Sequence, residues 1–228
     1  MLYYRVSKAF FEPVIMSLLR YSVFVAFFVS LVLLTVLVLQ TLSFGRRRLH
    51  SRAEGKRWQG MAYALGRGML PWEKESAARH LPTYVAGMIY HAGVFAAILS
   101  VLFLAAEIRP PEAAVTVFRF FLAAGFLSGA GLLLKRAVQP RMRYISCPDD
   151  YVSNLLVDGF VLSGLLSSLI AAAEPVFFIL AILTFLYMPL GKIRHCFFFF
   201  YSRLLFGSYF GRRGVLPRKR PPRLEILS

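Results

Sequence analysis

The stretch YSVFVAFFVSLVLLTVLVLQTLSF, residues Tyr21–Phe44, contains no charged side chain. A bilayer core about 30 Å thick is crossed by roughly 20 apolar residues in a helix, so this stretch predicts a membrane span. The rest of the chain agrees, because 58% of its 228 residues are hydrophobic and its mean hydropathy is +0.62. One soluble core could not bury so much apolar surface.

Four more apolar runs follow, and each is long enough to cross a bilayer. They are about Pro82–Ala106, Ala113–Leu134, Tyr151–Ala173, and a last run that begins at Pro175 and passes Pro189 into GKIRHCFFFFY. We therefore expect an all-α integral membrane protein, a bundle of five transmembrane helices. Its expected parts are a periplasmic or interfacial segment (1–20), the membrane domain (21–210) and a basic cytoplasmic tail (211–228).

The chain is strongly basic, with 27 Lys and Arg against 11 Asp and Glu and a net charge of +16. Its bases gather after the first run, after the third run and in the tail, whereas the Glu107–Glu112 loop holds one Arg and two Glu. The positive-inside rule then places the N-terminus outside and the C-terminus in the cytoplasm. Because the bases flank spans, nucleic acid is not an expected partner. The two cysteines form no CxxC pair, which argues against an iron–sulfur or zinc site in this chain.

His91 and His195 lie inside separate apolar runs. An imidazole in hydrocarbon is costly unless its nitrogens are satisfied, so such a residue is a functional hypothesis. Histidines from facing helices commonly provide the axial ligands of a haem iron. His91 lies roughly 14 Å and His195 roughly 9 Å from the same side, at 1.5 Å per residue. These depths predict one haem b in the cytoplasmic half. His80 is the rival ligand, but it precedes its apolar run.

Several polar residues lie on the same side as the two histidines. The candidate partners of haem propionates are Lys192, Arg194, Arg141 and Arg143, since carboxylates are bound well by such cations. For any single one of them, the favoured expectation is that it only marks the membrane interface. Asp158 lies roughly 10 Å inside the fourth run. It is expected either to pair with a loop arginine or to exchange protons with a quinone.

Three pieces of sequence resemble a known family: MIYHAGVF (Met88–Phe95), LLLKRAVQPRMRYISCPDDYVSNLL (Leu132–Leu156) and PLGKIRH (Pro189–His195). They are similar to the gamma-subunit family of respiratory nitrate reductase. The closer similarity is to the membrane cytochrome b subunits of heterodisulfide-reductase-like complexes associated with dissimilatory sulfite reduction. The resemblance covers about Gly66–Phe210. It implies five helices, haem b, menaquinone or another quinone, a cytoplasmic iron–sulfur (heterodisulfide-reductase-like) subunit and the prokaryotic cytoplasmic (inner) membrane.

The chain departs from the two-haem members of this family at Val101 and Phe177, where the resemblance would place the ligands of an outer haem. Neither side chain can bind iron, so we expect one haem per chain. Quinone chemistry is then expected near the cytoplasmic half, or else a further membrane subunit continues the electron path. Two other readings stay open, a haem-free membrane anchor and a transporter. No hydrolytic motif is visible, so the expected role is that of an electron-transfer subunit of an oxidoreductase complex rather than of an enzyme by itself.

Overall fold

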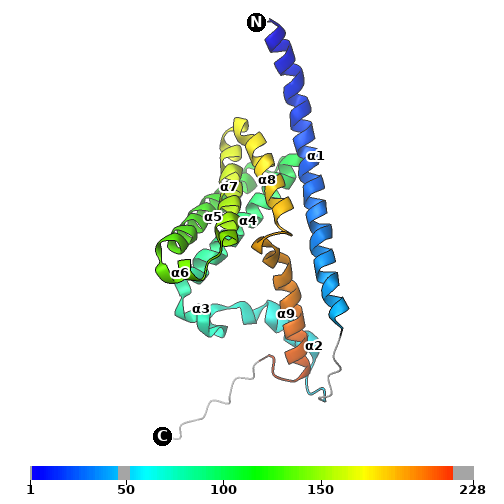
Figure 1. Ribbon diagram of the computed structural model, residues 1–228, viewed down its shortest axis with the longest axis vertical. Helices are drawn as coiled ribbons and strands as arrows, with labels where there is room; N and C mark the ends of the chain where they lie inside the picture. Colours follow the sequence, from blue (N-terminus) through cyan, green and yellow to red (C-terminus); the bar gives the residue numbers. More distant parts are fainter. Residues whose placement is uncertain (1, 46–51, 218–228) are drawn as a thin grey trace. The chain divides into compact units, whose positions relative to one another are not determined.

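The computed structural model describes residues 2–45 and 52–217 (Figure 1). Within these residues every regular element is a helix, which confirms the expected all-α class. Four helical segments are long and apolar enough to cross a membrane: Pro13–Phe44, Leu81–Ala105, Glu112–Val138 and Pro148–Leu169. A fifth span is counted if Ala171–Tyr187 and Lys192–Arg212 are taken together as one broken span.

The chain divides into two compact units, and each is described by itself. The first unit comprises residues up to Thr35 together with Pro82–Arg194, and the second comprises Val36–Leu81 together with the residues from His195 onward.

The first unit is a helical bundle. Its helices are α1 (Leu2–Gln40, up to residue 35), α4 (Leu81–Ala105), α5 (Glu112–Val138), α6 (Pro140–Tyr144), α7 (Pro148–Leu169) and α8 (Glu174–Tyr187), with short 3-10 turns η4 (Ala171–Ala173) and η5 (Lys192–Arg194). Helix α7 packs between α5 and α8 (Figure 1).

The core of the first unit is aromatic. Phe160, Phe177 and Phe185 are fully buried, with Phe160 stacked on Phe177 at a ring separation of 5.4 Å. Phe27 of α1 meets Phe185 edge-on at 5.2 Å. Val101 is fully buried in the same cluster. Because lipid tails are as apolar as these side chains, their close packing rather than their removal from water stabilises the bundle.

Helices α4 and α5 approach each other through two glycines. A methyl group added at Gly93 would lie 2.6 Å from the Cα of Gly125, and one added at Gly125 would lie 2.6 Å from the Cα of Gly93. Small residues allow such close backbone contact between membrane helices. Lys135 of α5 also donates a hydrogen bond to the Thr83 hydroxyl of α4, 2.5 Å away.

The second unit joins the segment after α1 to the last helix. It contains the end of α1, η1 (Thr41–Phe44), α2 (Arg57–Leu65), η2 (Arg67–Met69), η3 (Pro71–Glu73), α3 (Glu75–Arg79) and α9 (His195–Arg212). Helix α2 lies against α9, with Gly60 facing Gly207 and Gly211 at backbone contact. The Thr41 and Tyr201 hydroxyls are hydrogen-bonded at 2.6 Å.

Three helix boundaries differ from the expected ones. Helix α1 already includes residues 2–20, which the sequence placed outside the first span. Helix α7 begins at Pro148, because Pro148 occupies its first turn and the Asp150 side chain accepts a hydrogen bond from the Cys147 N–H at 2.9 Å. Its last residue is Leu169. The expected tail lies mostly outside the described residues, which end at 217.

The last expected span is interrupted. Helix α8 ends at Tyr187, and the helical path resumes at η5 and α9. Pro189 lies in the interruption; its ring disfavours a helical residue before it and it has no N–H to donate. A side chain at Gly191 would collide with the Tyr187 ring and would lie 3.0 Å from Asp149. His195 is therefore the first residue of a helix rather than a mid-helix residue.

Candidate functional site

His91 lies on an exposed face of α4, within a segment apolar enough to span a membrane. Its Nδ1 is 2.6 Å from the carbonyl oxygen of Gly87, one turn earlier. Because a carbonyl only accepts, this contact requires the hydrogen on Nδ1 and leaves the lone pair on Nε2. Metal-binding histidines commonly donate their other ring N–H to a backbone carbonyl in this way.

The same face of α4 offers space beside His91. Gly87 precedes His91 by four residues, so both lie on one side of the helix. A methyl group added at Gly87 would meet no atom within 4 Å. Met88 and Phe95, each within a turn of His91, are also exposed. This face of α4 is therefore uncrowded around His91.

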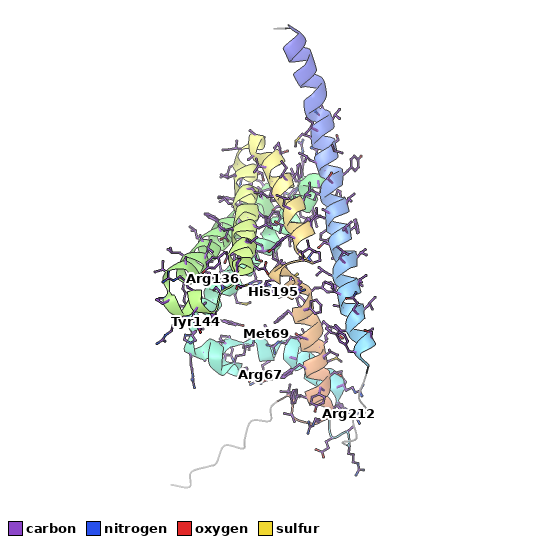
Figure 2. The ribbon with its side chains drawn as sticks, viewed as in Figure 1. Arg67, Met69, Arg136, Tyr144, His195 and Arg212 are labelled. Atoms are coloured by element: carbon purple, nitrogen blue, oxygen red, sulfur yellow. The ribbon has the colours of Figure 1, made fainter. Side chains whose placement is uncertain are left out.

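His195 is exposed at the first position of α9 (Figure 2). It belongs to the second unit, whereas His91 belongs to the first. Both expected ligands are thus exposed, His91 in the first unit and His195 in the second. His80, the rival ligand, is exposed directly after α3 and lies outside the candidate spans.

Lys192 has carboxylate partners within the first unit. Its Nζ is 2.6 Å from Asp150 Oδ2, and its backbone N–H donates to Asp149 Oδ2 at 2.9 Å. Tyr187 donates a hydrogen bond to Asp149 as well, and Arg136 lies 3.5 Å from Asp150. These contacts tie the interruption after α8 to the start of α7. Among the expected propionate partners, Lys192 is therefore already engaged in an ion pair.

The remaining candidate cations are exposed. Arg141 and Arg143 lie on α6, the short helix between α5 and α7, and Arg194 is the last residue of η5. Exposed guanidinium groups are available to the carboxylates of a ligand without the rupture of an internal ion pair.

Asp158 is only 5% exposed and lies among three helices of the first unit. Its Oδ2 accepts a hydrogen bond from Asn154, one turn earlier on α7, at 2.8 Å. The Tyr90 hydroxyl of α4 lies 3.4 Å from the same Asn154 nitrogen. On α5, Gly129 makes room for the Asp158 Oδ1 and the Tyr90 ring, with which a side chain there would collide. The sequence offered a loop arginine as a possible partner of Asp158. In the described part of this unit, the carboxylates that form ion pairs are those of Glu107, Glu112 and Asp150, and Asp158 is not among them.

Sequence reasoning missed Gly87, Tyr90 and Asn154. The signal for Asn154 was its spacing, since Asp150, Asn154 and Asp158 recur every four residues and so share one face of α7. Tyr90 and His91 are neighbours whose rings lie 6.3 Å apart. The partly buried Tyr90 borders Asp158, and the exposed His91 lies on the outer face.

A cavity of about 320 Å³ lies near the loop between α4 and α5. Phe103, Phe118 and Phe177 form part of its apolar wall, while Arg109 and Ser167 contribute polar groups. Ligand sites typically combine an apolar lining with a few polar groups. The cavity lies near the start of α5, at the opposite end of that helix from Lys135 and Arg136.

In the part of the chain that the structure describes, no three His, Cys, Asp or Glu side chains gather into a group that could hold a metal ion. A haem requires only axial ligands from the protein, so the paired-histidine hypothesis does not depend on such a group. No family model, curated protein or solved structure matches the chain.

Proposed function

We propose that this chain is the haem b subunit of a respiratory complex in a prokaryotic cytoplasmic membrane. It passes electrons between menaquinone or another quinone and a cytoplasmic iron–sulfur subunit of the heterodisulfide-reductase-like kind. The proposal includes five spans with the N-terminus outside and the C-terminus in the cytoplasm, as the distribution of basic loops favours.

The observation that carries the proposal is the state of His91. A histidine within an apolar membrane segment is a functional hypothesis by default, because ionisable residues are costly there. The Gly87 carbonyl lies 2.6 Å from Nδ1, a contact that fixes the tautomer whose Nε2 carries the lone pair a metal binds. The open space at Gly87 would leave room for a ligand of His91 on this face of α4.

The chain's own residues would hold the group as follows. His91 and His195 are the residues that would bind the iron, as the resemblance to the cytochrome b family implies. Arg141, Arg143 and Arg194 are the proposed partners of the propionates, while Lys192 instead stabilises the interruption before His195 through Asp150. When bound, haem b supplies one-electron transfer between ferric and ferrous iron.

The quinone is proposed to exchange at the cavity near the loop between α4 and α5. Its volume of about 320 Å³ falls within the usual range for small-molecule sites. Aromatic walls suit a flat ring, and Arg109 and Ser167 can donate hydrogen bonds to ring oxygens. The cavity favours this end over the cytoplasmic half that the sequence suggested. His91 and Phe103 lie twelve residues apart on α4, about 18 Å along the helix, so a further membrane subunit could carry electrons between the two places.

The test is the haem content of the purified chain and of matched variants. The pyridine haemochrome assay should give one haem b per wild-type polypeptide. His91→Ala should lose the Soret absorption, whereas His80→Ala, which changes an exposed histidine outside the spans, should retain it. Wild-type protein without haem, produced with adequate haem supply, would contradict the proposal and favour a haem-free membrane anchor. Two haems per chain would contradict the single-haem stoichiometry.

A further inference from the structure

Asp158 presents an unusual combination of burial and incomplete hydrogen bonding. The residue is 5% exposed, and its Oδ1 is buried without a hydrogen-bond partner. A buried carboxylate is costly unless other charges or hydrogen bonds compensate it, and the cost is greater within a membrane-spanning helix. Asn154 donates to its other oxygen at 2.8 Å, and Tyr90 hydrogen-bonds to the same carboxyl group.

The elements packed around Asp158 provide no opposing charge. Helix α4 contributes Tyr90, the titratable group beside it, and α5 contributes Gly129. On α7 itself the neighbour is Asn154. Among the described residues no Lys, Arg or His forms an ion pair with Asp158. The surroundings therefore stabilise the ionised form poorly, and a change in a nearby charge can decide whether the carboxyl holds a proton.

A polar stripe links Asp158 to one end of its helix. Asp150, Asn154 and Asp158 follow each other at intervals of four residues on α7, so they lie on one face. Asp150 is held at the start of α7 by Lys192 and Arg136. This stripe leads from the polar start of α7 to the buried carboxyl.

We propose that Asp158 is a redox-linked proton site, which binds one proton when the haem held by His91 is reduced and releases it when the haem is oxidised. This inference rests on the proposed function. An electron from a quinol, or from dithionite in the test, converts ferric to ferrous iron, and the Asp158 carboxylate binds one proton to become the neutral acid. No other bond changes. Tyr90, whose ring lies 6.3 Å from that of His91, hydrogen-bonds to Asp158 and keeps its own proton throughout.

The coupling follows from Coulomb's law in a medium of low dielectric constant. The positive charge of the ferric centre partly compensates the Asp158 carboxylate, and reduction removes that charge. The uncompensated carboxylate then takes up a proton, because a neutral acid costs less to bury.

The first experiment labels the haem-loaded protein with dicyclohexylcarbodiimide, an apolar reagent that adds a protonated carboxyl across its C=N bond without a leaving group. Peptide mass spectrometry should find several-fold more modified Asp158 in dithionite-reduced than in oxidised protein. Asp150, ionised and paired with Lys192, is the internal control and should stay unmodified in both states. Equal labelling of Asp158 in the two states would overturn the proposal.

The second experiment reads the same proton without a reagent. The reduced-minus-oxidised infrared spectrum should contain a band from a protonated carboxyl group, and Asp158→Asn, which retains the size and an acceptor oxygen, should remove it. The same variant should flatten the pH dependence of the haem midpoint potential. An infrared spectrum without such a band overturns the proposal whatever the labelling shows. A protein without haem would instead refute the proposed function, so the two failures are distinguishable.

Discussion

Asp149, at the start of α7, accepts a hydrogen bond from the backbone N–H of Lys192, 2.9 Å away, across the interruption that follows α8. The same carboxylate accepts hydrogen bonds from Tyr187 and from Ser153. One side chain thus gathers donors from both ends of the interruption and holds the turn that leads into His195.

We expect Asp149→Ala to destabilise the protein by about 1–2 kcal/mol, because several hydrogen bonds worth about 1 kcal/mol each are lost. Asp149→Asn, which keeps an acceptor oxygen for the Lys192 N–H, should lose less. Thermal unfolding in detergent measures both. Equal stability of wild type and Asp149→Ala would show that the turn does not need this carboxylate.

Gly125→Val should be among the most damaging substitutions in the first unit. The added carbon would lie 2.6 Å from the Cα of Gly93, so α4 and α5 must separate, at a cost of about 1–3 kcal/mol or more. Gly131→Val, on the same helix, is the matched control because a methyl group there meets no atom within 4 Å. Its effect should stay within about 0.5 kcal/mol. Similar unfolding temperatures for the two variants would refute the close contact.

Lys74 makes stability depend on pH at the alkaline end. Burial, and secondarily the nearby Arg203 charge, lower the pKa of Lys74 from its ordinary value of 10.5. At pH values between the lowered pKa and 10.5, Lys74 binds more protons in the unfolded chain than in the folded chain. The free energy of unfolding therefore rises with pH through this window, and the cost of burying the charged lysine disappears. Relative to wild type, Lys74→Gln should be more stable at neutral pH, and the difference should shrink toward pH 10.5. A difference that grows with pH would contradict this sign.

Ser100→Phe should occupy the cavity near the loop between α4 and α5, since Ser100 contributes to its lining. Quinol-dependent haem reduction should fall at least tenfold, while the haem content and the dithionite-reduced spectrum stay unchanged. Leu127→Phe, at an exposed position of α5 outside the cavity lining, is the control and should retain the wild-type rate. Unimpaired quinol oxidation in Ser100→Phe would place the quinone elsewhere.

The membrane class and most spans could be predicted from the sequence, because runs such as Tyr21–Phe44 are apolar whatever surrounds them. The second span illustrates the accuracy: the expected Pro82–Ala106 compares with the observed Leu81–Ala105. The interruption before His195 was harder to foresee, because apolar residues continue on both sides of Pro189. Hydropathy does not reflect that a proline lacks the backbone N–H that a helix needs.

The surroundings of the candidate residues depended on tertiary contacts. Burial of Asp158 was expected from its run, but its partners Asn154 and Tyr90 come from two helices, and the space for its carboxyl comes from Gly129 on a third. Likewise, the ion pair of Lys192 with Asp150 joins segments 42 residues apart and gave no local sequence signal. Pairings between distant segments are not encoded in local composition or periodicity.

The contact of Gly60 with Gly207 and Gly211 has a consequence for biogenesis. Helix α2 leaves the ribosome early, whereas α9, against which it packs, is synthesised only after the intervening spans have emerged. Until α9 is synthesised, α2 has no partner for this contact. In a chain truncated before α9, helix α2 would therefore stay exposed to quality-control proteases.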